Sequence, residues 1–216
     1  MLRPLDGPRS EPRGRTPSAL VVLLHGYGAN GDDLIVLGDS WRRYAPEAVF
    51  VAPNAPEPVP GMMGALQWFA LTMRDPSEYG RGVAAAAPAI DRFLDKELAR
   101  YRLQPGRLVL VGFSQGTMMA MHVGLRRAAA PGGIIGYSGL LAAPERLGEA
   151  KARPPILLVH GEADDLIPAD ALHIAREQLA RSGFGVEWHV RPRLGHGIDP
   201  EGQHMGGQFI AQVLKG

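Results

Sequence analysis

Short apolar runs recur along the chain and are separated by segments rich in Gly, Pro and charged residues. Most of these runs are continuous, which is typical of parallel strands that are covered on both faces of a sheet. The last run instead alternates between apolar and polar residues, as a strand with one covered face does. The pattern predicts strands over residues 20–24, 48–51, 107–111, 133–137, 156–160 and 186–191.

Between these strands, apolar residues recur at the spacing of a helix. The clearest helical stretch contains Ile90, Phe93, Leu94, Leu98 and Tyr101. Pro88 starts or kinks this helix, because proline lacks an N–H and crowds the preceding turn. Further helices are predicted over residues 32–44, 115–127, 169–181 and 202–214. Regular alternation of strands and helices predicts an α/β fold, with a mostly parallel, doubly wound sheet and right-handed crossovers.

Length and composition limit the domain organisation and the partners. A chain of 216 residues suits one domain, which we place at residues 19–216. Residues 1–18 hold four Arg and four Pro without an apolar run, which predicts a flexible N-terminal arm and no signal peptide. The net charge of +1 is dispersed, so we expect no binding of nucleic acid. No apolar run reaches the roughly 18 residues of a membrane span.

The absence of Cys excludes disulfides, thiolate catalysis and thiolate metal sites, and it fits a cytoplasmic protein. The histidines are scattered, without paired carboxylates at the spacing of metal ligands, so we expect no metal site. The oligomeric state is left open, a homodimer included.

One pentapeptide carries the strongest chemical signal. Gly112-Phe113-Ser114-Gln115-Gly116 follows the apolar run 107–111 and precedes a predicted helix, so G-x-S-x-G lies at a strand-to-helix turn. At such a turn the central Ser is forced into strained dihedral angles, and flanking glycines are needed because a Cβ would clash. The turn lifts the Ser114 hydroxyl above the sheet, which makes it a candidate nucleophile.

A serine nucleophile needs a general base, and the base needs a carboxylate to orient it. Asp164 and Asp165 follow the predicted strand 156–160, and His196 follows the predicted strand 186–191. Each group therefore comes after a different strand at its carboxyl end, where the catalytic groups of open α/β sheets collect. The order Ser, Asp, His is that of the α/β-hydrolases and not of the other two common serine-triad folds.

Seven histidines compete for the role of base. His196 alone combines a Gly-flanked loop, the correct order and a position after the last strand, so we assign the base to it. His25 and His160 end apolar strands ahead of glycines, where a hydrogen-bonded structural role is the default. His122 lies on an apolar helix and is interpreted as a core residue. The other three lie within a predicted strand or helix: His173, His189 and His204.

A second Gly-containing turn, His25-Gly26-Tyr27-Gly28, follows the first apolar strand. In α/β-hydrolases a turn at this place supplies one backbone N–H of the oxyanion hole, and the residue after the nucleophile supplies the other. We therefore assign the two donors to the main-chain N–H groups of Tyr27 and Gln115, with no chemical role for either side chain.

Together these motifs resemble the phospholipase/carboxylesterase family, which includes the acyl-protein thioesterases. The resemblance runs from about Ala19 to Lys215. It rests on His25-Gly26-Tyr27-Gly28, Gly31-Asp32, Ala52-Pro53-Asn54-Ala55-Pro56, Trp68-Phe69, the serine pentapeptide, His160-Gly161, Asp164, Ile167-Pro168 and Gly195-His196. It implies an α/β-hydrolase fold in a single compact domain without a large cap.

The resemblance also implies that Ser114, Asp164 and His196 are the catalytic residues. One departure matters: the family often has proline after the catalytic Asp, whereas this chain has Asp165. Two adjacent carboxylates therefore compete for one role, and the family spacing favours Asp164. In that case we interpret Asp165 as a carboxylate that caps the loop before Pro168.

The resemblance implies a serine carboxylesterase that acts on small-molecule esters through an acyl-enzyme and needs no cofactor. We expect short- to medium-chain esters. Thioesters and lysophospholipids are family alternatives, and a hydrolase fold that binds a ligand without turnover is an alternative from another class. The complete set of triad candidates argues against the latter. Ser114 at the turn argues against dienelactone-hydrolase-like chemistry, which uses Cys there.

Residues 53–79 break the strand–helix rhythm. They are Pro-rich and then unusually apolar, with Val59, Met62, Met63, Leu66, Trp68, Phe69, Leu71 and Met73. A long irregular segment in a compact domain is often functional. We therefore expect residues 56–73 to line the acyl groove, and the candidate substrate contacts are Met62, Met63, Leu66 and Trp68. By contrast, the methionines that follow the serine turn are interpreted as core filling: Met118, Met119 and Met121.

Overall fold

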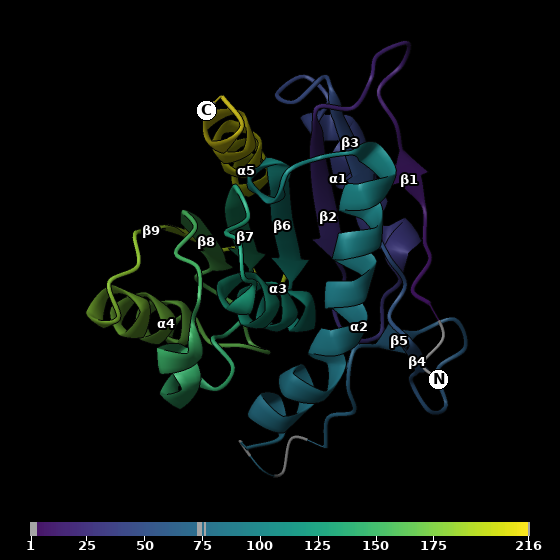
Figure 1. Cartoon of the computed structure of the whole chain (residues 1–216). Helices are drawn as coiled ribbons and strands as arrows, with labels where there is room; N and C mark the ends of the chain where they lie inside the picture. The colour runs from purple at the N-terminus through teal and green to yellow at the C-terminus, as the bar shows by residue number, and fades with distance from the viewer. Residues whose placement is uncertain (1–3, 73–74, 76, 216) are drawn as a thin grey trace.

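Within the residues that the structure describes, a seven-stranded sheet forms the centre of the molecule (Figure 1). The computed structural model describes residues 4–72, 75 and 77–215. The strand order is β1-β3-β2-β6-β7-β8-β9, and neighbours are parallel except for β1, which runs antiparallel to β3. The strands are β1 Arg9–Ser10, β2 Ala19–Leu24, β3 Ala48–Val51, β6 Leu108–Phe113, β7 Gly133–Tyr137, β8 Ile156–Gly161 and β9 Val186–Arg191.

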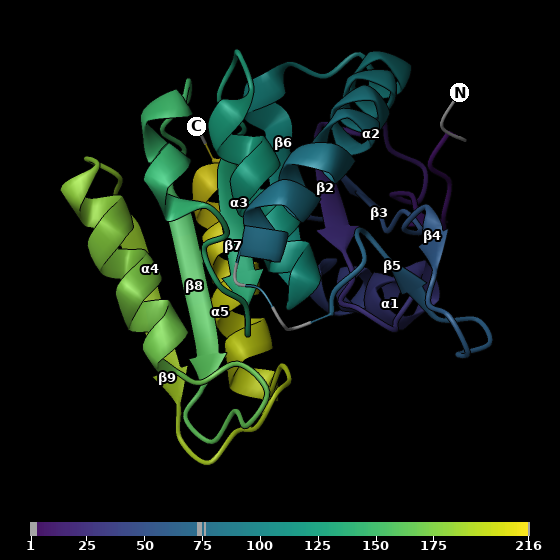
Figure 2. The same cartoon turned by 90° about the horizontal axis from the view of Figure 1, so that it is seen from below.

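Helices cover both faces of the sheet (Figures 1 and 2). Helices α2, α3 and α4 lie on one face, and α1 and α5 lie on the other. The helices are α1 Gly31–Trp41, α2 Ser77–Tyr101, α3 Gln115–Arg126, α4 Asp170–Arg181 and α5 Pro200–Val213, with short 3₁₀ helices η1 Pro105–Arg107 and η2 Pro144–Glu149. Among the described residues, no helix is long and apolar enough to cross a bilayer.

The apolar strands divide their side chains between two cores. In β2, Leu20 and Leu24 contribute to the core under α2, α3 and α4, whereas Val21 and Leu23 contribute to the core under α1 and α5. Successive side chains of a strand point to opposite faces, so a strand that is covered on both sides must be apolar at every position. This arrangement explains why the runs in the sequence are continuous.

The predicted strands agree with β2, β3 and β6 to β9 to within two residues at either end. Helix α2 differs, because it begins at Ser77 and Pro88 lies inside it. The residues before Pro88 are mostly Gly and Ala, so the large apolar residues that mark a helical face are sparse there. Proline within a helix removes one hydrogen bond but does not stop the chain from continuing as a kinked helix when packing supports it.

The irregular segment 53–72 contains a small antiparallel hairpin, β4 Glu57–Pro58 and β5 Leu66–Gln67, which sequence patterns did not predict (Figure 1). Its turn uses Gly61 and Gly64, both with positive φ angles near +80°. Met73, one of the apolar residues in the predicted groove, lies outside the described residues.

Part of the predicted arm contacts the domain: Leu5 and Pro12 are buried, whereas residues 13–16 are exposed. Leu5 is buried in the core, and β1 extends the sheet beside β3. The Arg9 guanidinium donates to the buried carboxylate of Glu97 on α2 at 2.9 Å. A strand of two half-buried residues has no apolar pattern, so only its long-range contacts reveal it.

The carboxyl ends of the parallel strands meet at one edge of the sheet, toward which Figure 2 looks. Because β2, β6, β8 and β9 run in the same direction, the loops that follow them lie at this edge. These loops and the first residue of α3 hold all five residues that the sequence assigns to the chemistry, although they come from four segments that are far apart along the chain.

Candidate active site

Ser114 lies at the turn between β6 and α3, with φ of 54° and ψ of −117°. This region of backbone space costs a non-glycine residue about 1–3 kcal/mol. The turn is possible because its neighbours lack side chains. A Cβ on Gly112 would lie 2.3 Å from the backbone of Gly116, and a Cβ on Gly116 would lie 1.8 Å from the Leu24 carbonyl oxygen. Steric limits therefore explain why both glycines of G-x-S-x-G are needed.

The neighbouring strand β7 holds this turn in place. The Tyr137 carbonyl accepts hydrogen bonds from the Ser114 N–H at 2.9 Å and from the Thr117 hydroxyl at 2.8 Å. The same hydroxyl lies 2.8 Å from the Gly112 carbonyl, so Thr117 joins the start of α3 to the ends of β6 and β7. These bonds offset part of the strain at Ser114, because a strained conformation persists only where its surroundings determine it.

Asp164 follows β8, and its side chain is fully buried with 0% exposure. Its Oδ2 lies 2.8 Å from Nδ1 of His196. Its Oδ1 accepts the backbone N–H groups of Leu166 at 3.0 Å and Ile167 at 2.9 Å. Asp165, the competing carboxylate, is exposed. The geometry thus brings Asp164 to His196 and leaves Asp165 at the surface.

The surroundings of Asp164 keep it ionised. Burial alone would raise the pKa of this carboxyl group, but the hydrogen bonds from Ile167 and His196 outweigh burial and hold the pKa below its ordinary value of 3.8. An ionised carboxylate at Nδ1 favours the His196 tautomer that carries its proton on Nδ1. Nε2 of His196 is then free to accept a proton.

The loop of His196 is joined to the loop of Asp164 by close backbone contacts. The Ala163 N–H donates to the Leu194 carbonyl at 2.8 Å. A Cβ on Gly161 would lie 2.3 Å from the carbonyl oxygens of both Leu194 and Gly195. Only glycine at position 161 allows the two loops to approach this closely. The separation between Asp164 and His196 is therefore determined by the backbone.

Two side chains from the neighbouring strands complete the support of His196. Ser138, at the end of β7, is buried and donates from its hydroxyl to the Gly197 carbonyl at 3.2 Å. The ring of Phe113 lies against the imidazole, with the ring centroids 5.0 Å apart. Neither residue was singled out from the sequence, because nothing local marks a contact between strands β6 or β7 and a loop after β9.

The two proposed oxyanion donors have free N–H groups. Among the described residues, neither the Tyr27 N–H nor the Gln115 N–H has a hydrogen-bond partner. Gln115 is the first residue of α3, where the N–H groups have no acceptor within the helix. A Cβ on the adjoining Gly26 would lie 3.2 Å from Cβ of Ser114, so the turn after β2 lies directly against the serine.

The side chain of Gln115 has a structural role that the sequence did not indicate. It is buried, its carbonyl oxygen accepts the Trp68 N–H at 2.9 Å, and its amide donates to the Phe69 carbonyl at 2.8 Å. The Trp68 indole in turn donates to the His25 carbonyl at 2.9 Å. The amide of Gln115 thus attaches residues 68–69 to the residue that presents the N–H.

A mostly apolar cavity of about 440 Å³ opens beside Ser114. It is lined by Gly26, Tyr27, Ala29, Leu71, Tyr79, Phe113, Ser114, Gln115, Met118, Leu166, Ile167 and His196. Among the described residues, Ser114 and His196 form no direct hydrogen bond, although both line this cavity. Such bonds are often long or poorly aligned until a substrate is bound.

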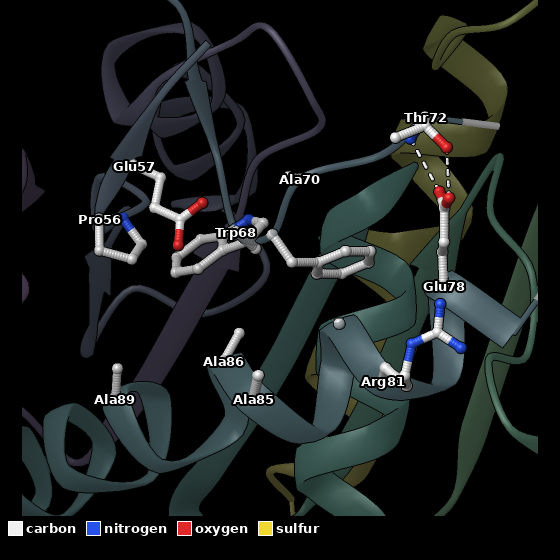
Figure 3. A pocket seen from close by; sticks show the side chains of 12 residues that line it. Pro56, Glu57, Trp68, Ala70, Thr72, Glu78, Arg81, Ala85, Ala86 and Ala89 are labelled. Carbon is white, nitrogen blue, oxygen red and sulfur yellow. Dashed lines mark hydrogen bonds between the residues drawn. The ribbon is translucent and has the colours of Figure 1, made fainter. Parts of the chain in front are cut away.

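The four predicted groove residues are not among the described residues that line this cavity. Met62 and Met63 are exposed on the hairpin, and Met63 is entirely so. Trp68 is buried and faces a second cavity of about 450 Å³, between residues 56–72 and α2 (Figure 3). Figure 3 shows Glu57 and Trp68 on one side of that cavity and the small residues of α2 on the other.

Three of the lining residues were missed in the sequence for identifiable reasons. Leu166 and Ile167 lie two and three residues after Asp164, and two apolar residues in a Gly- and Asp-rich loop could have marked them. Met118 was interpreted as core filling; it is buried and also reaches the cavity wall. Within the described part of the chain, no group of three or more His, Asp or Glu residues is placed to hold a metal ion.

Comparison with known proteins places these features in a family. A model of the family described as phospholipase/carboxylesterase matches residues 7–214. Acyl-protein thioesterase 1 of Gibberella zeae is 28% identical over 208 residues, which cover 88% of each chain. Acyl-protein thioesterase 1 of Saccharomyces cerevisiae is 28% identical over 211 residues, which cover 90% of this chain and 92% of the yeast protein.

Solved structures agree with this assignment. The crystal structure of esterase PE8 has a TM-score of 0.93 and 39% identity, with 97% of this chain and 99% of that chain covered. Arabidopsis thaliana SOBER1 has a TM-score of 0.80 and 23% identity, with 91% of this chain and 99% of that chain covered, which shows the shared fold. The chain therefore belongs to the phospholipase/carboxylesterase family of α/β-hydrolases, whose members are of the carboxylesterase and thioesterase type.

Proposed function

We propose that the protein is a serine esterase that hydrolyses carboxylic esters through a covalent acyl-enzyme. One observation carries the proposal: Ser114, His196 and the residues with the two free N–H groups line a single apolar cavity, while Asp164 is hydrogen-bonded to His196 behind it. A nucleophile, a base and an oxyanion site around one cavity are the parts that acyl transfer requires.

In the first half of the reaction, Nε2 of His196 takes the proton of the Ser114 hydroxyl while Oγ attacks the carbonyl carbon of the ester. The electron pair of the C=O bond moves onto its oxygen, which becomes the oxyanion of a tetrahedral intermediate. When the intermediate collapses, the bond to the leaving oxygen or sulfur breaks, and the imidazolium donates its proton to that atom. The acyl group remains on Oγ.

In the second half, water replaces the serine as nucleophile. His196 removes a proton from water, and the resulting hydroxide attacks the acyl carbon to form a second tetrahedral intermediate. Collapse breaks the bond to Oγ, and His196 returns the proton to Ser114. The products are the carboxylic acid and the alcohol or thiol, and the protein is restored. Asp164 stays ionised throughout and stabilises the imidazolium.

The N–H groups of Tyr27 and Gln115 stabilise the oxyanion in this scheme. Each donor of this kind contributes about 3–4 kcal/mol to the transition state in a site with little water. Both groups belong to backbone that is fixed before substrate binds: Gln115 by helix α3, and Tyr27 by the turn against Ser114. Little reorganisation is then needed as the charge develops.

The wall of the cavity supports a short- to medium-chain acyl group as substrate. Leu71, Met118, Leu166 and Ile167 provide apolar surface around Ser114. Each buried methylene contributes about 0.8 kcal/mol, so selectivity rises with acyl length until the cavity is full. A series of p-nitrophenyl esters from acetate to palmitate measures this dependence, and a kcat/KM that does not vary with length would contradict it.

Thioesters are the second candidate substrates, because the relatives from Gibberella zeae and Saccharomyces cerevisiae are named acyl-protein thioesterases. The same residues would act on a thioester, with a thiolate as the leaving group. Matched oxygen and sulfur esters with the same acyl chain separate the two candidates. If the kcat/KM for the sulfur ester divided by that for the oxygen ester is near one after correction for intrinsic reactivity, both ester classes remain candidate substrates.

A covalent probe tests the proposal directly. A fluorophosphonate should label the protein at Ser114, and Ser114→Ala should abolish both labelling and nearly all ester hydrolysis. Ser182→Ala, at the end of α4, serves as the control and should label and turn over like the wild type. Labelling that persists in the Ser114→Ala variant at the wild-type rate would exclude Ser114 as the nucleophile.

The cytoplasmic location expected from the sequence belongs to the same proposal, with small-molecule esters as substrates. It is supported by the lack of Cys, because proteins of reducing compartments rarely rely on disulfides. Fractionation of cells that express the untagged protein tests it. Recovery mainly in a membrane fraction, with release by salt or detergent, would contradict it.

A further inference from the structure

His160 is a buried polar residue next to the candidate triad. It is the next-to-last residue of β8, just before the loop of Asp164, and it is only 2% exposed. It is not among the residues that line the cavity at Ser114, so it has no access to a bound ester there. Any influence on the chemistry must therefore pass through another residue.

The polar contacts of the His160 side chain with described residues lead to the loop of Asp164. Nε2 of His160 lies 2.7 Å from the Ile167 carbonyl oxygen and 3.2 Å from Oδ2 of Asp164. Both neighbours are acceptors, since the carbonyl has no proton and the carboxylate is ionised. The Nε2 atom must therefore carry a proton, which hydrogen-bonds to the carbonyl and lies beside the carboxylate.

These contacts place two imidazoles at one carboxylate oxygen. Oδ2 of Asp164 faces Nδ1 of His196 at 2.8 Å and Nε2 of His160 at 3.2 Å, while Oδ1 accepts the N–H groups of Leu166 and Ile167. A carboxylate has about four lone-pair positions; three face hydrogen-bond donors, and the Nε2–H of His160 lies beside the fourth. Because the side chain is fully buried, water cannot replace a donor that is lost.

The bond to Ile167 adds a second effect. It fixes the turn from Asp164 to Ile167, and this turn brings the two backbone N–H groups to Oδ1. His160 thus holds the carboxylate through the turn, and its Nε2–H, which is donated to the Ile167 carbonyl, also lies 3.2 Å from Oδ2. A histidine with only a packing role would need neither contact.

We propose that His160 is a positioning residue for the reaction: its Nε2–H holds the Asp164 carboxylate in the orientation in which Asp164 supports His196. This inference rests on the proposed function of the triad. It goes beyond it by adding a fourth side chain, outside the cavity, on which the acid–base geometry depends. The loss of such a supporting contact at a catalytic or metal ligand typically costs tenfold to a hundredfold.

A matched pair of variants tests the role of the donor. His160→Gln keeps an N–H near the position of Nε2, whereas His160→Met has a similar length and no donor. We expect His160→Gln to stay within about threefold of wild-type kcat and His160→Met to lose about tenfold or more, with KM for p-nitrophenyl acetate changed less than twofold. Equal kcat values for the two variants would overturn the proposal.

A control separates this effect from the loss of any buried histidine. His122, on α3, is buried, and its Nδ1 has no hydrogen-bond partner among the described residues. His122→Met should leave kcat and KM unchanged. Thermal unfolding of all variants shows whether they fold, and His160→Phe replaces His160→Met if the latter does not. A kcat loss in His122→Met equal to that in His160→Met would assign the effect to packing.

A double-mutant cycle shows whether His160 acts through Asp164. In the Asp164→Asn background, His160→Met should cost less than about twofold in kcat, because the carboxylate that it positions is already absent. A loss of tenfold in both backgrounds would overturn the inference and leave the triad intact. If Asp164→Asn alone keeps full activity, the proposed triad is wrong, so the two failures give different results.

Discussion

The loops that hold Asp164 and His196 are joined to each other by backbone hydrogen bonds and by a glycine contact too close for a Cβ. Residues 53–72, which the Gln115 side chain attaches next to Ser114, contain a hairpin whose tip carries an exposed methionine, Met63. A Cβ on Gly161 would meet two carbonyl oxygens at 2.3 Å, whereas a Cβ on Gly64 would meet no described atom within 4 Å.

This contrast separates the geometry of the candidate catalytic residues from substrate preference. The relative position of acid and base depends on contacts that tolerate little change, because interiors are close-packed and a shift of about 1 Å can cost a hundredfold in rate. The hairpin side can change its residues without moving Asp164 or His196. Substrate preference can therefore vary while the chemistry is preserved. Five predictions test this contrast.

The largest effect is expected at the acid. Asp164→Asn should lower kcat/KM about a thousandfold, because the amide cannot stabilise the imidazolium and favours the wrong tautomer of His196. Asp165→Asn should cost less than about tenfold, since this side chain is exposed. Both variants are measured with one p-nitrophenyl ester. If Asp165→Asn lost most of its kcat/KM and Asp164→Asn kept it, the orienting carboxylate would be Asp165 and not Asp164.

A pair of glycine substitutions tests the backbone contact. Gly161→Ala should lower kcat about a hundredfold, because the new Cβ pushes the loop of His196 away from that of Asp164. Gly64→Ala places a Cβ in open space at a φ of +79°, so we expect about 1 kcal/mol of lost stability and unchanged kcat. Similar kcat values in the two variants would remove the contrast between the two sides.

The amide of Gln115 connects the two sides, and its loss should have an intermediate effect. Gln115→Met removes the bonds to the Trp68 N–H and the Phe69 carbonyl while the backbone N–H remains. We expect about a tenfold loss in kcat/KM, because residues 68–69 lose their attachment beside the oxyanion site. The control is Gln67→Met, which removes one longer bond in the hairpin. Wild-type activity in Gln115→Met would show that the attachment is unnecessary.

Acyl-chain selectivity distinguishes the cavity wall from the hairpin tip. Leu166→Ala should shift the preferred acyl length of p-nitrophenyl esters and change the ratio of octanoate to acetate turnover by about threefold to tenfold, because Leu166 lines the cavity. Met63→Ala should change this ratio less than twofold, since its side chain is entirely exposed. A larger change in Met63→Ala or Leu66→Ala would support the groove that the sequence predicts.

The smallest effect concerns stability at low pH. Hydrogen bonds hold the pKa of folded Asp164 below 3.8, so its contribution to stability is present above that pH and is lost as the pH falls through the folded pKa. Between pH 5 and pH 2, the free energy of unfolding should therefore fall more steeply in the wild type than in Asp164→Asn. Urea unfolding at both pH values measures the difference, and parallel curves would contradict it.

The sequence predicts those parts of the molecule that depend on local pattern. Continuous apolar runs predict the central strands, because each residue of a strand covered on both faces must be apolar. The glycines around Ser114 predict the turn, because steric limits on a strand-to-helix turn act within five residues. Chain order, together with the direction of parallel strands, predicts that Asp164 and His196 reach the same edge.

Other features depend on contacts between distant segments and leave no local pattern. Strand β1 is recognisable only from its pairing with β3, and the start of α2 carries Gly and Ala in place of large apolar residues. The cavity wall combines the end of β6 and the serine turn with residues from four further loops and two helices, so no single window of sequence contains it. The contact of His160 with Asp164 arises from the way in which the chain returns after β8.

Helix α3 begins directly after Ser114, and no side chain caps its first turn. The N-terminus of a helix carries about half a unit of positive charge, and a suitable cap is worth about 1 kcal/mol of stability. In the proposed mechanism, the oxyanion of the tetrahedral intermediate lies at this positive end of the helix. The transition state would then take the place of the missing cap of α3.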